Sequence, residues 1–574
     1  MSSAAASPRA ASSPSPRETR ARGETRAPRE TRARRETRAR REPRARRAPL
    51  RRAAVAGLAA PLLRAALVAA LGLASVLGLA CALAGGARAE EPPISAATED
   101  CLACHDLLHP GIVGDWRDSR HARRSPEQGL AVPEAQRRVS GDAIPEALAA
   151  SAVGCAECHA LRPGEHDDAF EHNGHLVHVV VSPSDCAVCH PVEADQYSRN
   201  IMAHAHDNLE GNALYRDLQR HILGAPSRQA GALAFAEPDE TTKAQACLYC
   251  HGTRLAFAGL EERETDFGAM SFPRIDGWPN QGVGRVNLDG SLGSCSACHT
   301  RHAFAIETAR QPYTCKECHV GPDVPVYKVY ASSKHGNIFA SQGKSWDLEA
   351  VPWEVGEDFT APTCAACHVS LLTAPGGGVV AERTHQMNDR IARRIFGLIY
   401  SHPHPLDPNT TKIRSADGLP LPTALDGTPA AEFLIDESEQ AARRETMAGV
   451  CRSCHSRPWV QEHFRRYDHI HETTNAATLE ATGIMGEIWS RGLASGPDRG
   501  ASPFDEAVEQ RWCDIWLFYA NSTRFAAAMA GGGDYAVFAD GHYAMAKAIK
   551  ELQEWLELRA RLEDGSATGS GTGR

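Results

Sequence analysis

The chain has 574 residues, a formal net charge of −9 at pH 7 and 18 Cys. This cysteine content would suit a disulfide scaffold or a set of zinc sites. Its arrangement excludes both, because sixteen of the Cys fall into eight C-x-x-C-H motifs and only Cys81 and Cys513 are left over. Disulfide frameworks put no demand on the residue after a Cys, and zinc modules do not place His directly after each second Cys.

The first 89 residues predict two segments ahead of the motifs. Residues 1–52 form an Arg-rich low-complexity segment with 17 Arg and 5 Glu, which cannot bury a core and is expected to be disordered. Residues 53–89 are almost wholly apolar and end in Ala87-Arg88-Ala89, an A-x-A cleavage site. We therefore expect a signal peptide and a periplasmic protein. The alternatives are a basic arm for nucleic acid, an uncleaved membrane anchor and a lipoprotein attached at Cys81.

Cleavage after Ala89 makes the chain strongly acidic. Removing the 19 Arg and 5 Glu of residues 1–89 from the totals of 62 basic and 71 acidic residues leaves 43 and 66, a net charge of −23. Such a surface repels nucleic acid and favours a basic partner. We expect a small soluble c-type cytochrome as the redox partner and no binding of nucleic acid.

The eight C-x-x-C-H motifs each predict one covalently attached haem c. Two thiols add to the two vinyl groups of the haem, and the adjacent His reaches the iron as its proximal ligand. The two residues between the thiols allow a short helical turn that presents both sulfurs to the ring edge. The Cys are Cys101, Cys104, Cys155, Cys158, Cys186, Cys189, Cys247, Cys250, Cys295, Cys298, Cys315, Cys318, Cys364, Cys367, Cys451 and Cys454. The proximal ligands are His105, His159, His190, His251, His299, His319, His368 and His455.

The histidine count leaves room for a second ligand on most of these irons. Of 26 His, 18 remain after the proximal ones, so most haems can carry two imidazoles. A haem without a second ligand can bind a substrate, and the pocket on its open side decides the chemistry.

The rest of the sequence predicts a mainly α fold, a multihaem cytochrome c fold with long irregular loops and a C-terminal helical region. We expect a haem-binding domain over residues 90–460, the helical region over 461–563 and a disordered tail at 564–574. Helices are predicted at 437–449 and from His542 to about 563, where apolar residues recur at helical spacing. Strand signals are few and short, as at 177–181.

The flanks of the fifth, sixth and seventh motifs carry a family resemblance. SCSACHTRHAFAIETARQPYTCKECHVGPDV, VYASSKHGNIF and APTCAACH resemble the octahaem hydroxylamine oxidoreductase family. The resemblance covers residues 98–562 and is most specific at 294–370. It implies a homotrimer in which seven haems have two His ligands and the fourth is five-coordinate and catalytic. Motif order carries the catalytic role to the haem held by Cys247, Cys250 and His251.

The resemblance also implies distal iron ligands. His121 in WRDSRHA, His302 in TRHAF, His335 in SKHGN and His385 in ERTHQ are similar to the family's distal histidines. By position we add His175 and His204, for which His172, His178 and His206 are close competitors. The seventh distal ligand is not placed.

Two further residues bear on the direction of catalysis in that family. The oxidising members have an Asp-His pair after the sixth motif, and the match here is Asp323-Val324, which keeps the carboxylate and lacks the imidazole. They also have a late Tyr that cross-links to the catalytic haem of a neighbouring subunit. Tyr535 is the best match and Tyr543 the second.

These features predict redox chemistry on a small nitrogen compound at the fourth haem. Our first expectation is oxidation of hydroxylamine or a related compound, with electrons leaving through the haems that have two His ligands, and with Asp323 accepting protons. Reduction of nitrite or hydroxylamine to ammonia at the same haem is the alternative. An electron-transfer cytochrome without a substrate is the alternative from another class. The flanks at 294–370 and the lack of a C-x-x-C-K motif disfavour a sulfur-oxyanion reductase.

Overall fold

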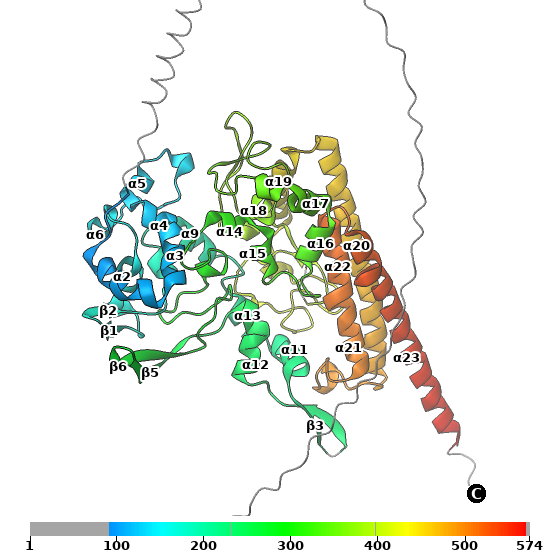
Figure 1. Ribbon diagram of the computed structural model, residues 1–574. Helices are drawn as coiled ribbons and strands as arrows, with labels where there is room; N and C mark the ends of the chain where they lie inside the picture. Colours follow the sequence, from blue (N-terminus) through cyan, green and yellow to red (C-terminus); the bar gives the residue numbers. More distant parts are fainter. Residues whose placement is uncertain (1–90, 230, 396–397, 570–574) are drawn as a thin grey trace, which may run out of the picture. The chain divides into compact units, whose positions relative to one another are not determined.

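The computed structural model describes residues 91–229, 231–395 and 398–569. The predicted Arg-rich segment and signal peptide, residues 1–89, lie outside the described residues. The fold of the described part is mainly α with a few short strands, which confirms the predicted fold class (Figure 1). No helix in this part is long and apolar enough to cross a membrane.

Most of the C-x-x-C-H motifs lie in short helices. In the third motif the backbone N–H of His190 donates to the carbonyl of Cys186 at 2.8 Å, and the other motifs close in the same way. This turn brings two cysteines three residues apart to one side of the backbone. The helices before the C-terminal region are α2 (Ala96–Leu108), α3 (Pro110–Asp118), α4 (Arg120–Arg123), α5 (Pro126–Leu130), α6 (Glu146–Ala149), α7 (Cys155–His159), α8 (Pro183–Cys186), α9 (Pro191–Ser198), α10 (Ala205–Glu210), α11 (Ala213–Leu223), α12 (Glu240–Gln245), α13 (Cys247–His251), α14 (Ile306–Arg310), α15 (Pro312–Lys316), α16 (Val326–Ser332), α17 (Lys334–Gln342), α18 (Cys364–His368) and α19 (Glu437–Arg452).

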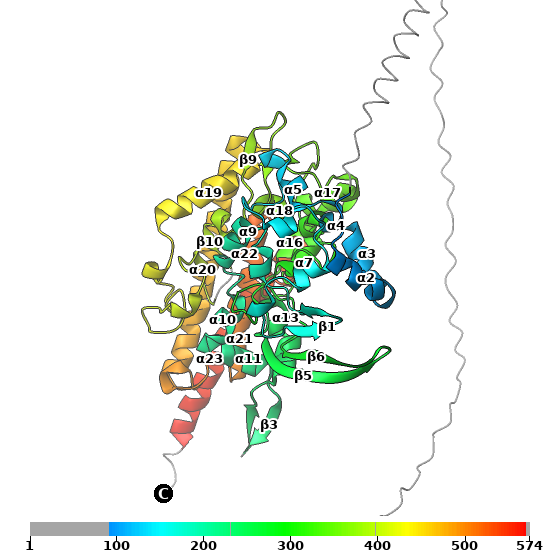
Figure 2. The ribbon, with the colours of Figure 1, turned by 90° about the vertical axis from the view of Figure 1, so that its left-hand side faces the viewer.

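The strands form small, separate sheets. They are β1 (Phe170–His172) with β2 (His175–Val177), β3 (Pro226–Gln229) with β4 (Ala232–Phe235), β5 (Ala256–Thr265) with β6 (Gly268–Asp276), β7 (Trp353–Glu354) with β8 (Leu372–Thr373) and β9 (Val379–Ala381), and β10 (Arg393–Arg394) with β11 (His402–Pro403). All pairs are antiparallel except β7 with β8. Strand β1 lies beside β6 (Figure 2).

Two strand features differ from the sequence-based prediction. The strand predicted at 177–181 ends at Val177, because the carboxylate of Asp168 accepts from the backbone N–H groups of Val179 and Val180 at 2.9 and 3.0 Å. Those two amides are therefore not available to a neighbouring strand. The long hairpin of β5 and β6 was not predicted. It turns through Asp266 and Phe267 and pairs Thr265 with Gly268.

Both predicted helices are confirmed and extend beyond their predicted ends. Helix α19 begins at Glu437, where the side chain of Asp436 accepts from the Glu439 N–H at 2.8 Å, and it continues into the eighth motif. Helix α23 (His542–Gly569) runs past residue 563, so residues 564–569 are helical where we expected a disordered tail. Residues 564–569 continue α23 because adding a hydrogen-bonded residue to an existing helix costs less free energy than starting a new helix.

The C-terminal region is a group of long helices that pack on one another. Helices α20 (Arg457–Ser490), α21 (Ala507–Asp514), α22 (Ala520–Ala528) and α23 surround the largest apolar cluster (Figure 1). Ile488, Trp516 and Leu552 are fully buried in it. A π-helical turn joins α21 to α22, and a second one precedes α23. Helix α22 also contacts α16, so this region packs directly on the part of the chain that carries the motifs.

Candidate functional site

One large apolar cavity connects all eight motifs. Its volume is about 2840 Å³, several times the roughly 300–1,000 Å³ of a typical ligand pocket. All eight motif histidines line it, as do all the motif cysteines except Cys104. Four buried imidazoles on its wall have an Nδ1 atom without a hydrogen-bond partner among the described residues, those of His172, His319, His368 and His385. An apolar cavity bordered by paired thiols and by imidazoles fits a set of covalently bound haems.

Cysteines that shift each other's pKa lie close together and show which motifs are neighbours. The thiols with the largest such effects are those of Cys101 and Cys155, Cys186 and Cys295, Cys250 and Cys318, and Cys315 and Cys364. Smaller effects on pKa link Cys158 to Cys189, Cys298 to Cys315, and Cys367 to Cys451. The motifs therefore follow one line in the order first, second, third, fifth, sixth, seventh, eighth. The fourth motif joins this line at the sixth.

Five of the proximal imidazoles face a second imidazole across the cavity. Two imidazoles bound to opposite faces of one metal ion, at metal–nitrogen bonds of about 2 Å, have ring centres about 6 Å apart. The pairs with this separation are His105 with His172 at 6.1 Å, His159 with His302 at 6.4 Å, His190 with His121 at 6.4 Å, His299 with His385 at 6.4 Å, and His455 with His335 at 6.1 Å. His178 also lies 6.1 Å from His159, but both of its ring nitrogens contact backbone carbonyls, so His302 is the candidate ligand.

The structure separates the six predicted distal histidines into two groups. His121, His302, His335 and His385 each lie opposite a proximal histidine. His175 and His204 do not. The imidazole of His175 contacts Asp100 at 3.2 Å, and that of His204 contacts the Ser198 carbonyl at 2.8 Å.

His172 takes the place predicted for His175. The two residues pair across the hairpin of β1 and β2, joined by Asn173 and Gly174, which both have positive φ. An Asn-Gly pair is the strongest short-range hairpin signal, so the sequence H-N-G-H could have revealed this turn. It could not have shown which of the two imidazoles faces the first motif.

Three proximal histidines, His251, His319 and His368, face no second imidazole at this separation among the described residues. Two further imidazoles line the cavity without such a pairing, those of His404 and His463. The Nδ1 atom of His404 lies 3.1 Å from the Pro405 carbonyl, and His463 stacks on Trp459. Neither residue was predicted from the sequence, because no family motif marks them.

The pocket at the fourth motif brings together two of the predicted catalytic residues. His251 is held by a hydrogen bond between Nδ1 and the Ala205 carbonyl at 3.2 Å. Burial lowers the pKa of His251, and the carboxylate of Asp323 opposes this shift, so the two side chains lie within range of charge interaction. Asp323 and Val324 both line the cavity. Val324 also packs against the apolar cluster of Val329, Phe525 and Ala536.

The third predicted catalytic residue, Tyr535, lies outside the cavity of its own chain. Its hydroxyl is 3.5 Å from the Ser522 hydroxyl, and the ammonium group of Lys328 lies 5.8 Å from its ring centre. Partial burial raises the pKa of the phenol. Within one chain, therefore, Tyr535 does not meet His251. Tyr543, the second candidate, is 61% exposed.

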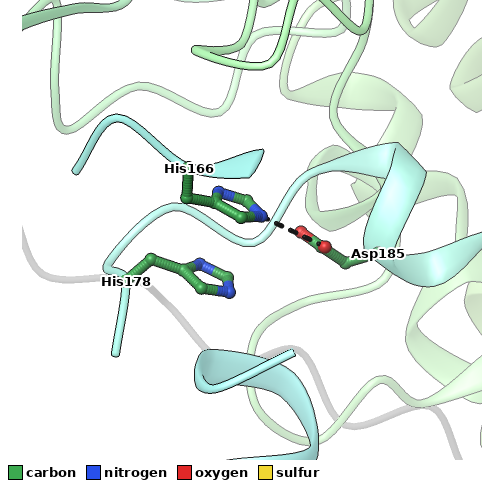
Figure 3. A group of neighbouring side chains, drawn as sticks. All are labelled: His166, His178 and Asp185. Carbon is green, nitrogen blue, oxygen red and sulfur yellow. Dashed lines mark hydrogen bonds and ion pairs between the residues drawn. The ribbon is translucent and has the colours of Figure 1, made fainter. Parts of the chain in front are cut away.

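A separate cluster of His166, His178 and Asp185 has the composition of a metal site (Figure 3). The two imidazole rings are stacked, with centres 3.6 Å apart and planes within 5°. Because the lone pair of an imidazole nitrogen lies in the ring plane, no single point is in line with both rings. Both nitrogens of His178 contact backbone carbonyls, and Asp185 contacts Arg162 at 2.7 Å. We interpret the cluster as a buried hydrogen-bonded network that supports the second and third motifs.

Comparisons with known proteins agree with the haem-binding interpretation. A family model described as "Seven times multi-haem cytochrome CxxCH" matches residues 287–389. A curated relative, the probable nitrite reductase-hydroxylamine oxidoreductase fusion protein of Kuenenia stuttgartiensis, is 25% identical over 276 residues, which are 47% of this chain. The chain spans only about a quarter of the length of that relative.

Two solved structures resemble the fold. The reducing HAO-like protein complex of Kuenenia stuttgartiensis is 18% identical, with a TM-score of 0.53 over 82% of this chain and 87% of that chain, which shows likeness of fold alone. A structure described as a hypothetical multiheme protein is 39% identical, with a TM-score of 0.77 over 83% of this chain and 98% of that one. With this near-complete coverage and the geometry of its motifs, the chain belongs to the multihaem c-type cytochromes.

Proposed function

We propose that this cytochrome is an oxidoreductase that reduces a small nitrogen compound, nitrite or hydroxylamine, at the haem of the fourth motif. The observation that carries the proposal is the pocket of His251. No second imidazole faces it among the described residues, a feature that it shares with His319 and His368, and the carboxylate of Asp323 lies within range of both His251 and His319. Motif order in the resembling family selects the fourth motif among these three. A haem iron with one open side supplies a binding place for a small nitrogen ligand and exchanges electrons with it.

In this proposal each residue of the pocket has a separate role. His251 would hold the haem iron, and its contact with the Ala205 carbonyl fixes the orientation of the imidazole. The carboxylate of Asp323 delivers protons to the substrate as electrons arrive. Val324 keeps the neighbouring wall apolar, so Asp323 is the acidic side chain available for this transfer.

The remaining motifs form the proposed electron path. We propose eight haems c, with His121, His172, His302, His335 and His385 as distal ligands and with His404 and His463 as candidates for two of the others. We further propose a periplasmic homotrimer that exchanges electrons with a basic soluble c-type cytochrome.

The direction of reaction rests on two observations. Val324 stands where the oxidising members of the resembling family have an imidazole. The phenol of Tyr535 lies 3.5 Å from the Ser522 hydroxyl of its own chain. The curated relative carries both "nitrite reductase" and "hydroxylamine oxidoreductase" in its description, so it is compatible with either direction. Oxidation of hydroxylamine is the second candidate, favoured by the family resemblance of residues 294–370.

Steady-state assays of the haem-loaded protein test the direction. We expect faster turnover of nitrite or hydroxylamine with a low-potential electron donor than of hydroxylamine with an oxidised cytochrome c. We also expect haem-stained chains to separate as monomers in denaturing electrophoresis. A cross-linked species that is lost in Tyr535→Phe or Tyr543→Phe, together with faster oxidation, would establish the second candidate instead.

Ligand binding separates an enzyme from an electron carrier. An open haem binds cyanide and gives a high-spin ferric signal from about one haem in eight, whereas irons with two His ligands are low-spin. A protein with only low-spin haems and no cyanide binding is an electron carrier, and the proposed function is then wrong.

A further inference from the structure

Arg310 carries a positive charge into the protein interior without an ion pair among the described residues, and Asp358, Asp347 and Glu349 act on this charge only from a greater distance. The residue is 4% exposed and ends helix α14, between the fifth and sixth motifs. No carboxylate oxygen of the described residues lies within ion-pair distance of its guanidinium group. Burial lowers the pKa of this group to about 10, so it is still charged at neutral pH. A buried charge is costly unless it is paired and hydrogen-bonded.

The hydrogen bonds of Arg310 use only one side of its guanidinium group. Nη1 donates to the carbonyls of Leu348 and Ala350 at 2.9 and 2.6 Å, while the buried Nε has no partner among the described residues. The ring of Trp353 lies 4.4 Å from the central carbon and holds the group in plane. The edge formed by Nε and Nη2 is therefore free, and this edge matches a carboxylate through two parallel hydrogen bonds.

The position of Arg310 indicates which carboxylate can bind this edge of the guanidinium group. Arg310 lines the same cavity as the motif residues. Helix α14 also packs against α18, which holds the seventh motif, so the guanidinium group lies among three haem attachment sites. The cavity wall here is mostly apolar, and each haem brings two propionate groups into such a cavity. We propose that Arg310 binds a haem propionate through Nε and Nη2, and that this ion pair raises the reduction potential of that haem.

This inference rests on haem attachment and is independent of the proposed function. A positive charge beside a haem favours the reduced iron, because the added electron lowers the total charge of the site. Losing the charge of Arg310 should therefore lower one midpoint potential and leave the others in place. We expect a tenfold change in the reduction equilibrium of that haem, which is 59 mV for a one-electron couple.

The experiment is a potentiometric titration of the haem-loaded protein, followed by absorbance and electron paramagnetic resonance. Arg310→Gln should lower one midpoint, and Arg310→Lys should restore most of the shift because it keeps the charge. The control is Arg561→Gln. Arg561 is a largely exposed residue of helix α23 that does not line the cavity, so all midpoints should stay unchanged. A fully loaded Arg310→Gln protein with every midpoint unchanged would overturn the proposal.

A structure of the haem-loaded wild-type protein gives a second test that needs no variant. A propionate oxygen within hydrogen-bond distance of Nε or Nη2 of Arg310 is the expected result. Finding the guanidinium group against a free anion, such as chloride or nitrite, or away from every propionate, would show that the proposal is wrong. The outcome of the catalytic assays does not affect the titration or the haem-loaded structure, so a failure of the proposed function can be told apart from a failure of this inference.

Discussion

The side-chain amide of Asn521 donates a hydrogen bond to the backbone carbonyl of Asp323 at 3.0 Å. Asn521 is buried on helix α22, and its amide also contacts the Leu517 carbonyl at 2.7 Å. The C-terminal helices α20 to α23, which hold none of the motifs, thus fix the position of the loop that carries the candidate proton donor. The long helices contribute to the site by fixing this loop against the fourth motif.

Replacing the carboxylate of Asp323 tests its role directly. Asp323→Asn keeps the size of the side chain and removes the proton donor, so nitrite reduction should fall by roughly 10²-fold or more, within the range of general acid catalysis. Haem content and cyanide binding should not change. The control is Asp266→Asn, which removes an exposed carboxylate in the turn between β5 and β6. Activity of Asp323→Asn within twofold of the wild type would remove this residue from the mechanism.

The number of haems is tested by intact mass. The exported wild-type chain should gain the mass of eight haems, and the double variant Cys364→Ala/Cys367→Ala should gain the mass of seven. Cys513→Ala is the matched control, since Cys513 is buried and belongs to no motif. Its haem count should equal that of the wild type. Any other count for the wild-type chain contradicts the assignment of one haem to each motif.

The hairpin of β1 and β2 offers a matched pair of variants for the first haem. His172→Ala should convert one low-spin haem to high-spin, because the ring of His172 faces His105 at 6.1 Å. His175→Ala removes the residue directly across the hairpin and should leave the spin states unchanged. Electron paramagnetic resonance of the ferric protein distinguishes the two results. If His175→Ala gives a high-spin haem and His172→Ala does not, His175 is the distal ligand of the first haem.

The buried carboxyl group of Glu509 makes stability depend on pH. Glu509 is fully buried, accepts a hydrogen bond from the indole N–H of Trp489 at 2.7 Å, and has its pKa raised by burial from 4.5 to about 7. Between these values the folded chain keeps a proton that the unfolded chain has lost. The free energy of unfolding therefore falls as the pH rises from about 4.5 to about 7, by on the order of 3 kcal/mol, and the loss is complete above that range.

Denaturant unfolding of the haem-loaded protein at pH 5 and pH 8 measures this effect. Glu509→Gln has no group to ionise, so relative to the wild type it should be more stable at pH 8 than at pH 5. Glu487→Gln, at an exposed position on helix α20, should show the pH dependence of the wild type. Equal pH dependence in Glu509→Gln and the wild type would show that Glu509 ionises as an ordinary surface glutamate.

The parts of the structure that could be predicted are those that local sequence determines. The C-x-x-C-H spacing itself closes a helical turn, so the positions of the cysteines and of the proximal histidines follow from the motif. Helix α19 could be placed at its first residue because Asp436 supplies the cap. Four of the five histidines that lie opposite a proximal imidazole could be predicted, because their flanks match a family motif.

The rest depends on contacts between distant segments. His404 and His463 reach the cavity only because β11 and α20 fold against it, and nothing next to them in the sequence marks that role. The end of β2 depends on Asp168, which lies in another segment and takes the amides that would have extended the strand. The hairpin of β5 and β6 was missed because its strands mix apolar and charged residues without strict alternation.

The contact between Cys250 and Cys318 has a consequence for the supply of electrons. It places the fourth motif on a side branch, where it meets a line of motifs that continues in both directions from the sixth. With a haem at every motif, the two arms form a reservoir that can be charged before the substrate arrives. A reduction that needs several electrons in quick succession can then draw on stored charge, without waiting for a separate encounter with the donor at each step.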